Sequence, residues 1–417
     1  MIRAHPLLAE RPADLELGFQ RMGLPTRARE YLLEKLPQYR LLLTGLTRVE
    51  GRFLKGLFEA STAPGREEYP VYVAGDPRTR LGSGLLVGRR EQLERLIAAA
   101  RAEPELAELA AALTRALESV ATPAPLTLGG RTFAFGARTY VMGVVNVTPD
   151  SFSDGGRFAT TEAAIAHGLK LAEAGADVLD VGGESTRPGS PRVSPEEELA
   201  RVVPVLEGLR ARTAVPLSVD TTKAAVARAS LAAGAVLIND ISGFHFDAEL
   251  PRVVAEAGAA CCLMHIQGTP ETMQQAPRYE DVLDEVLAFL EEGVARAVAA
   301  GVARERILVD PGIGFGKTLG HNLFLLRRLG DLRVLGLPVL VGTSRKGFLG
   351  ALTGGKPTGE RLAATLGSVA AVAALGGADF VRVHDVAEAR DALSVVDALR
   401  AATEGGALYG AAPKVGV

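Results

Sequence analysis

The chain has 417 residues, of which 47% are hydrophobic and 23% are charged, and its formal net charge is −3. This composition is typical of a folded globular protein and argues against extensive disorder. No basic surplus points to nucleic acid as the main partner, although a local anion site remains possible. No apolar run approaches the roughly 18 residues that a membrane-spanning helix needs, and residues 1–10 lack the organisation of a signal peptide, so we expect a cytoplasmic protein.

Residues 1–120 are predicted to form a small accessory α/β domain. Their pattern is mostly helical, with candidate strands at 69–73 and 83–87 and a helix from about 103 to 120. The charged residues of this segment form no cluster of catalytic types, and its role stays unknown. Two prolines in Ala121-Thr-Pro-Ala-Pro125 cannot continue the helix. Residues 121–138 are therefore predicted to be a linker and lead-in to the next domain.

Between residues 139 and 403, short β-branched runs alternate with longer alanine-rich helical segments. The candidate strands are 139–148, 177–184, 216–221, 236–243, 259–265, 307–312, 338–344 and 379–384. Eight such units predict a (βα)8 TIM barrel. An open doubly wound sheet shares the alternation, but no Gly-x-Gly-x-x-Gly follows the first strand. Residues 404–417 show no periodicity and are expected to be a loosely ordered tail.

Polar side chains are expected at the carboxyl ends of all eight predicted strands, where barrel enzymes carry their active sites. In chain order they include Asn146, Thr186, Arg187, Asp220, Asn239, His265, Asp310, Lys346, Arg382 and His384. Any one of them could be a satisfied core group or a rim salt bridge, but eight polar exits on one rim favour a functional site.

The residue types at this rim indicate what the site would hold. The acceptors among them match the amino and ring N–H groups of a pterin-like heterocycle, and they are Asp220, Asn239 and Asp310. The cationic or potentially cationic donors suit a phosphate or pyrophosphate, and they are Arg187, Lys346, Arg382 and His384. The residues alone therefore predict a site for a flat heterocycle that carries an anionic leaving group.

Two other motifs fail on their spacing. The segment Asp310–Thr318 ends like a nucleotide phosphate loop, but Pro311 stands where the first glycine is required. Its three glycines are predicted instead to let a flat ring approach the backbone closely. His265 near Cys261 and Cys262 could suggest zinc, but no second histidine is correctly spaced, so a zinc site is not expected.

Two long segments carry a resemblance to a known family. Met142–Gly156 and Gly175–Gly189 are similar to the two signatures of the dihydropteroate synthases, and shorter similar segments occur at 218–221, 238–243, 263–265, 310–316, 344–346 and 382–384. The resemblance covers about two thirds of the chain. It implies a homodimeric transferase of folate biosynthesis, inhibited by sulfonamides. The implied reaction condenses 6-hydroxymethyl-7,8-dihydropterin pyrophosphate with 4-aminobenzoate to give 7,8-dihydropteroate and pyrophosphate.

The resemblance also implies roles for individual residues. Those that would hold the pterin are Asp220, Asn239, Met264, Asp310, Phe315, Lys346 and Arg382. Those that would meet the pyrophosphate are Asn146, Thr186, Arg187, Arg382 and His384. Those that would form the aminobenzoate pocket are Phe152, Arg187, Pro188, Lys346 and Gly347. Asn146 would also bind Mg²⁺, a hard ion that suits oxygen ligands.

The implied chemistry is a dissociative displacement, with Asp154, Arg187 and Lys346 as the catalytic residues. Pyrophosphate would leave first, and Asp154 would stabilise the resulting pterin cation electrostatically. Many family members carry serine after Ser344-Arg-Lys346, whereas this chain has Gly347, so its affinity for aminobenzoate and sulfonamides cannot be inferred.

Two other functions share parts of this pattern. A methyltransferase that passes a methyl group from methyltetrahydrofolate to a corrinoid has the same barrel and pterin-holding acids, but it needs no pyrophosphate site. The second is a non-catalytic pterin-binding barrel, which the intact set of site residues disfavours.

Overall fold

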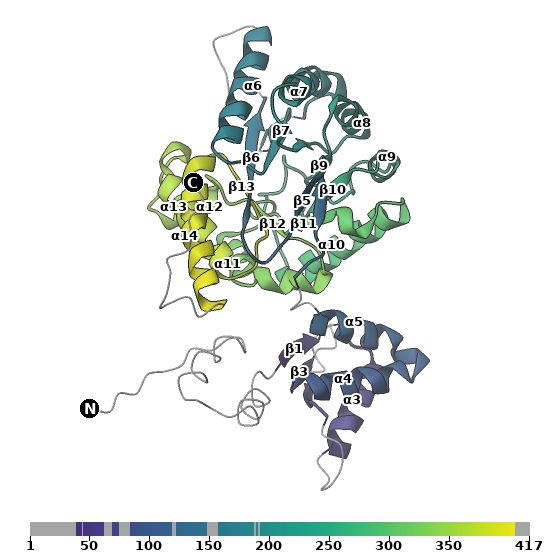
Figure 1. Cartoon of the computed structure of the whole chain (residues 1–417). Coiled ribbons are helices and arrows are strands. Elements are labelled where there is room, and N and C mark those ends of the chain that lie inside the picture. Colours follow the sequence, from purple (N-terminus) through teal and green to yellow (C-terminus); the bar gives the residue numbers. More distant parts are fainter. Residues whose placement is uncertain are drawn as a thin grey trace, which may run out of the picture. The chain divides into compact units, whose positions relative to one another are not determined.

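The computed structural model describes residues 39–43, 45–61, 69–74, 84–118, 122–147, 157–186, 189–190 and 192–404. The chain divides into two compact units, one of Met1–Ala121 with Leu399–Val417 and the other of Thr122–Ala398 (Figure 1). Within these described ranges no helix is long and apolar enough to cross a membrane.

The first unit contains a small antiparallel sheet with helices packed on it. Its strands are β1 (Tyr39–Leu43), β2 (Val71–Ala74) and β3 (Gly84–Gly88), in the order β1-β3-β2. Its helices are α3 (Arg48–Ser61), α4 (Arg90–Arg101) and α5 (Ala107–Glu118), with a short 3₁₀ turn at Pro104–Leu106. Tyr72 and Leu86 point from the sheet into a shared core with Leu54, Leu93 and Leu113. The two predicted strands are present, whereas β1 was missed because it contains no β-branched residue.

The second unit is a closed barrel of eight parallel strands (Figure 1). They are β6 (Tyr140–Asn146), β7 (Val178–Gly182), β8 (Leu217–Asp220), β9 (Leu237–Asp240), β10 (Ala260–Met264), β11 (Ile307–Asp310), β12 (Leu340–Val341) and β13 (Phe380–Val383). Neighbours in the chain are neighbours in the sheet, and β13 pairs with β6. A parallel bridge between Val309 and Val339 joins β11 to the start of the β12 segment and completes the ring. The predicted (βα)8 barrel is confirmed.

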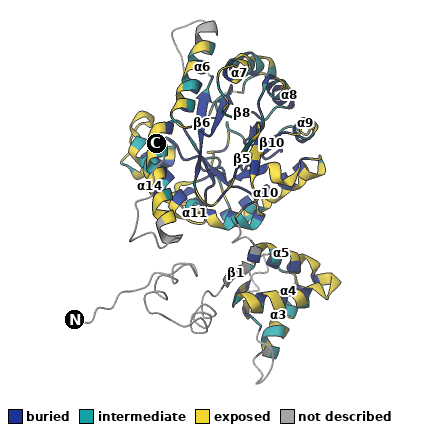
Figure 2. Ribbon diagram, viewed as in Figure 1, coloured by how far each residue is buried: buried dark blue, intermediate teal, exposed yellow. Residues whose placement is uncertain are grey.

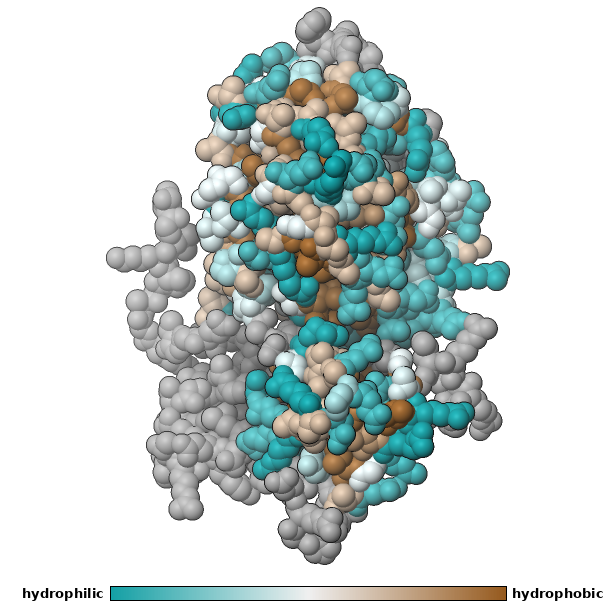
Figure 3. All heavy atoms as spheres, turned by 90° about the vertical axis from the view of Figure 1, so that its right-hand side faces the viewer, coloured by the Kyte–Doolittle hydropathy of each residue, from teal (hydrophilic) through white to brown (hydrophobic). Residues whose placement is uncertain are grey.

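Helices surround the strands and separate them from solvent. They are α6 (Arg157–Glu173), α7 (Pro195–Arg210), α8 (Ala224–Ala233), α9 (Leu250–Glu256), α10 (Val282–Ala299), α11 (Leu319–Arg327), α12 (Gly347–Leu352), α13 (Leu362–Ala374) and α14 (Val386–Glu404). In Figure 2 the strands are buried while the outer faces of the helices are exposed. This is the arrangement that an all-parallel sheet requires, since both of its faces must be covered. On the face drawn in Figure 3, hydrophilic side chains alternate with smaller hydrophobic areas.

The predicted lead-in at 121–138 is more than a connection. Within it, β4 (Leu126–Leu128) and β5 (Arg131–Phe133) form an antiparallel hairpin. Leu126, Leu128 and Phe133 are completely or almost completely buried in one cluster with the first residues of several barrel strands. The Phe133 ring meets Tyr140 edge-on with 5.0 Å between centroids. The hairpin therefore fills the amino-terminal end of the barrel, a role that two three-residue strands do not reveal in the sequence.

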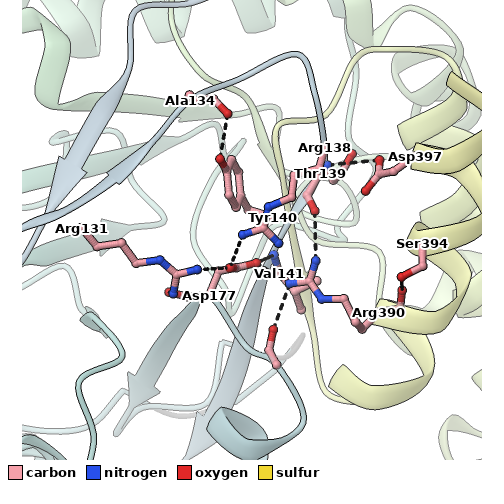
Figure 4. Close-up of polar contacts among 11 residues, drawn as sticks. Arg131, Ala134, Arg138, Thr139, Tyr140, Val141, Asp177, Arg390, Ser394 and Asp397 are labelled. Atoms are coloured by element: carbon pink, nitrogen blue, oxygen red, sulfur yellow. Dashed lines mark hydrogen bonds and ion pairs between the residues drawn. The ribbon is translucent and has the colours of Figure 1, made fainter. Parts of the chain in front are cut away.

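A buried carboxylate fastens this end of the barrel (Figure 4). Asp177, just before β7, accepts hydrogen bonds from Arg131 at 2.6 Å, from Arg138 at 2.8 Å and from Arg390 of α14. It also accepts one from the Val141 backbone at 3.0 Å. Burial by itself would raise the pKa of Asp177, but the Val141 N–H and the arginine charges lower it below its ordinary value. One ionised carboxylate thus joins the hairpin, the first strand and the last helix.

Removing the buried ring of the hairpin should destabilise the barrel. Phe133→Ala is expected to lower the free energy of unfolding by about 3–5 kcal/mol, because it leaves a cavity where the rings of Tyr140 and Phe380 now pack on Phe133. Chemical denaturation of the full chain measures this, with Thr132→Ala as the control because Thr132 is an exposed residue of the same strand. Equal effects of the two substitutions would contradict the plug role.

Candidate active site

The Arg382 guanidinium occupies the centre of the polar groups at the carboxyl ends of the strands. Its Nε donates to Asp180 of β7 at 2.6 Å and its Nη2 donates to Asp220 of β8 at 3.0 Å. Burial alone would lower the pKa of Arg382, but the two carboxylates raise it above its ordinary value. The site therefore contains a permanent cation held between two carboxylates.

Asp180 is a site residue that the sequence reasoning missed. It is completely buried, and the oxygen that binds Arg382 also accepts a hydrogen bond from the Asn239 side-chain amide at 2.9 Å. Its other oxygen, Oδ1, has no hydrogen-bond partner among the described residues. A carboxylate in the middle of the apolar run Val-Leu-Asp-Val was the available signal, since burying an unpaired charge is costly.

The two carboxylates carry more negative charge than Arg382 balances. Burial raises the pKa of Asp220, and the nearby Asp180 acts in the same direction against the effect of Arg382. The arrangement keeps acceptor capacity at Asp180 and Asp220 for a ligand that presents N–H donors.

Asp310 and Lys346 form a second charged pair of groups beside the first. Asp310 ends β11, is buried, and accepts a hydrogen bond from the Gly312 backbone at 2.7 Å. The Lys346 ammonium donates to the Ile313 carbonyl and lies 4.8 Å from the centre of the Phe315 ring. Burial lowers the pKa of Lys346 to about 8, while the charge of Asp310 opposes this shift.

An apolar surface adjoins these charges. Met264 at the end of β10 belongs to one buried cluster with Ile241, Ile266 and Met273, and Phe315 packs against that cluster. Met264 and Phe315 therefore lie on the same apolar surface, and their predicted role in lining a pterin slot stays a prediction. Together they offer a hydrophobic surface next to hydrogen-bonding groups, a combination found in small-molecule sites.

The glycines after β11 bring their loop close to neighbouring backbone, and the predicted approach of a flat ring to this loop stays a prediction. Gly312, Gly314 and Gly316 all have positive φ. A Cβ on Gly312 would lie 1.8 Å from the His265 carbonyl oxygen, and one on Gly316 would lie 2.7 Å from that of Gln267. These glycines let the β11 loop press against the backbone that follows β10.

The remaining predicted residues that are described lie at other strand exits. Asn146 ends β6 and Thr186 follows β7, and both are partly buried. The His384 ring contacts the Ser344 hydroxyl at 2.9 Å, which joins the exits of β12 and β13. Gly347 begins α12, and a Cβ there would meet nothing within 4 Å. The other predicted residues, Phe152, Asp154, Arg187 and Pro188, lie outside the described residues.

The described residues limit how a metal ion could be held. In those ranges no group of three or more His, Cys, Asp or Glu side chains could hold one. Asn146 offers a single amide oxygen at the rim. Such a site fits Mg²⁺ only if a phosphate-bearing substrate and water supply most of the ligands, which is how Mg²⁺ is usually bound.

Comparisons with known proteins place this chain in a family. A family model described as pterin binding enzyme matches residues 142–384, which belong to the barrel unit. The chain is 47% identical over 277 residues to the dihydropteroate synthase of Synechocystis, covering 66% of this chain and 96% of the relative. It is 49% identical over 265 residues to that of Escherichia coli, covering 64% and 93%.

Solved structures agree with these relatives. A dihydropteroate synthase of Xanthomonas albilineans, solved with 4-aminobenzoic acid, is 49% identical with a TM-score of 0.63, covering 67% of this chain and 99% of that one. One of Yersinia pestis, solved with a sulfonamide drug, is 46% identical with a TM-score of 0.63, covering 67% and 100%. The chain therefore belongs to the dihydropteroate synthases of the pterin-binding enzyme family.

Proposed function

We propose that this chain condenses 6-hydroxymethyl-7,8-dihydropterin pyrophosphate with 4-aminobenzoate, giving 7,8-dihydropteroate and pyrophosphate in folate biosynthesis. The observation that carries the proposal is the group of Asp180, Asp220 and Asn239 around Arg382, with the buried Asp310 nearby. These groups complement a heterocycle edge with several N–H donors. A relative from Xanthomonas albilineans was solved in complex with 7,8-dihydropteroate.

The pterin would lie between the hydrogen-bonding groups and the apolar surface. Asp220, Asn239 and Asp310 would receive or exchange hydrogen bonds with its amino and ring N–H groups. Met264 and Phe315 would cover its faces, and the planar Arg382 guanidinium would pack on the ring. Lys346, placed over Phe315, would donate to a ring acceptor.

Pyrophosphate would bind at the exits of β6, β7 and β13. Its proposed partners are Asn146, Thr186, Arg187, Arg382 and His384. Mg²⁺ bound with Asn146 would neutralise charge on the pyrophosphate as it leaves. The cationic side chains would add to this effect, because a preorganised positive site favours the departing anion.

The proposed reaction is dissociative. The bond between the pterin methylene carbon and the pyrophosphate oxygen breaks first, and both electrons leave with the oxygen. The pterin-stabilised cation is then attacked by the aromatic amine, which loses a proton as the new C–N bond forms. No protein nucleophile is needed, and Asp154 would favour the cation electrostatically.

Aminobenzoate would bind beside the reacting carbon. Phe152 and Pro188 would contact its ring, while Arg187 and Lys346 would supply positive charge. Gly347 has no side chain and open space around its Cα, so a hydroxyl contact to the carboxylate is missing there. Sulfonamides, which mimic aminobenzoate, would occupy the same pocket.

The homodimer implied by the family is also a proposal. Large apolar side chains are exposed on helices of the barrel, among them Phe324 of α11, Leu375 after α13 and Val395 of α14, at 44%, 49% and 62% exposure. If these helices form the dimer interface, a second subunit would cover these exposed side chains. A cytoplasmic location remains a prediction from the sequence.

The reaction itself can be tested by measuring pyrophosphate release. We expect release that depends on both the pterin pyrophosphate and 4-aminobenzoate, together with formation of 7,8-dihydropteroate. Omitting the amine is the control. Release that does not depend on the amine, or no release at all, would refute the proposed reaction and favour a non-catalytic pterin-binding barrel.

Asp154 should be needed for turnover rather than for pterin binding. Asp154→Ala is expected to lower kcat about 100-fold, because it removes a charge that stabilises the cationic transition state. Steady-state kinetics measure kcat, and titration with 6-hydroxymethylpterin measures pterin affinity. The neighbouring Ser153→Ala variant is the control. Near-full turnover of Asp154→Ala would exclude the electrostatic role.

The charge of Lys346 should set an alkaline limit on aminobenzoate binding. Burial lowers the pKa of Lys346 to about 8, so its positive charge is present below that pH and is lost as the pH rises through it. The KM for 4-aminobenzoate should therefore rise above about pH 8. Lys346→Arg should move this rise to higher pH, since arginine stays protonated. An unchanged pH profile in Lys346→Arg would assign the limit to another group.

A further inference from the structure

Lys317 is a buried lysine to which the proposed reaction gives no role. It lies in the loop between β11 and α11 and is only 3% exposed. Its amine is 2.8 Å from His265 Nδ1 and 2.9 Å from the Phe315 carbonyl oxygen. A buried amine is costly unless it is hydrogen-bonded, so an apolar residue would be the simpler choice for packing alone.

The direction of these hydrogen bonds follows from the protonation of the two side chains. Burial, and then the charge of Lys317, lowers the pKa of His265 far below its ordinary value, so this imidazole is neutral. Its Nδ1 can then accept a hydrogen bond from the amine while Nε2 carries the ring hydrogen. Burial also lowers the pKa of Lys317. Both hydrogen bonds persist in either state of Lys317, because a neutral amine still has two N–H groups.

Through these bonds the Lys317 amine joins the exits of two neighbouring strands. His265 directly follows Met264 at the end of β10, and its backbone N–H donates to the Asp310 carbonyl at 3.0 Å. Gly312 packs on the His265 carbonyl so closely that no side chain fits. Lys317 binds the carbonyl of Phe315, whose ring lies 4.8 Å from the Lys346 ammonium. Lys317 thus connects the backbone beside Met264 with the turn that carries Phe315.

Other side chains also hold the loop between β11 and α11. Asn322 of α11 accepts from the Gly314 backbone at 2.7 Å and donates to the Thr318 carbonyl at 2.8 Å. The Tyr279 hydroxyl donates to the Gly316 carbonyl at 2.7 Å. The Gln274 side-chain amide donates to the Gly314 carbonyl at 2.8 Å. These contacts come from α11 and from the segment between β10 and α10, whereas Lys317 binds the Phe315 carbonyl itself.

We propose that Lys317 is a positioning residue for the pterin: its amine holds the Phe315 turn against the end of β10 and so sets the spacing between Phe315 and Met264. This inference rests on the proposed function, because it assumes that the pterin lies at these two side chains. Lys317 does not touch the substrate and acts only through the loop that it fixes.

The test compares pterin binding with aminobenzoate binding in Lys317→Met. This variant keeps the length of the side chain and removes both hydrogen bonds. Affinity for 6-hydroxymethylpterin, measured by titration calorimetry, should fall about tenfold, which corresponds to the loss of a buried hydrogen bond. The KM for 4-aminobenzoate at saturating pterin pyrophosphate should stay within about twofold. Lys356→Met, at an exposed lysine of the same unit, is the matched control.

A second pair of variants tests the partner of Lys317. His265→Asn places a side-chain oxygen near the position of Nδ1 and should keep pterin affinity close to that of the unmodified chain. His265→Leu has no acceptor and should lose affinity as Lys317→Met does. Thermal unfolding of every variant identifies those that fail to fold.

The outcomes separate this inference from the proposed function. If the unmodified chain does not bind the pterin, the proposed function fails. If it binds the pterin and Lys317→Met binds equally well, the positioning role is wrong. The positioning role would also be overturned if Lys317→Met lowered pterin affinity and thermal stability and raised the KM for 4-aminobenzoate together, while His265→Asn and His265→Leu behaved alike. That result would indicate a purely structural lysine.

Discussion

The site depends on the pairing of one partly buried arginine with two carboxylates. Arg382 enters from β13, Asp180 from β7 and Asp220 from β8, so the ion pairs cross the interior of the barrel. A buried charge without a partner would cost several kcal/mol, and each of these groups is tolerated only because of the others. The pairing also fixes the Asn239 amide through Asp180. Asp180 and Asp220 keep hydrogen-bond acceptor capacity for a heterocycle in addition to the bonds that they accept from Arg382.

The amino-terminal end of the barrel is filled and closed, whereas the carboxyl-terminal end keeps a free hydrogen-bond acceptor. At the amino-terminal end the hairpin side chains Leu128 and Phe133 fill the interior, and Asp177 is saturated by arginines and a backbone N–H. No ligand could use that carboxylate without displacing its partners. At the other end Asp180 retains an oxygen that no described residue binds. Aspartate is therefore structural at the amino-terminal end and available for binding at the carboxyl-terminal end. The amino-terminal end is filled by the hairpin, so polar groups with a free acceptor lie at the other rim.

The sequence predicts those parts of the fold that repeat with a clear period. All eight strands and the polar residues at their exits were identified in this way, since a βα unit places its polar residue at a fixed point in each repeat. The hairpin was missed because two strands of three residues are too short to show a period, and β1 was missed because it contains no β-branched residue. Asp180 was missed because it lies inside β7, whereas the site residues were predicted at the ends of the strands. The partners of Lys317 and the packing of Gly312 depend on contacts between separate loops, which no local pattern encodes.

The glycine-rich loop after β11 differs from a nucleotide phosphate loop in how it uses its glycines and its lysine. In a phosphate loop, glycines free the backbone N–H groups for an anion. Here Asp310 accepts the Gly312 N–H and Asn322 accepts that of Gly314, so these two groups are already used within the protein. The glycines instead bring two loops into contact, and Lys317 joins those loops where a phosphate loop would direct its lysine to the ligand. The loop contributes Phe315 to the apolar surface beside Met264, and Lys346 from the exit of β12 lies over the Phe315 ring.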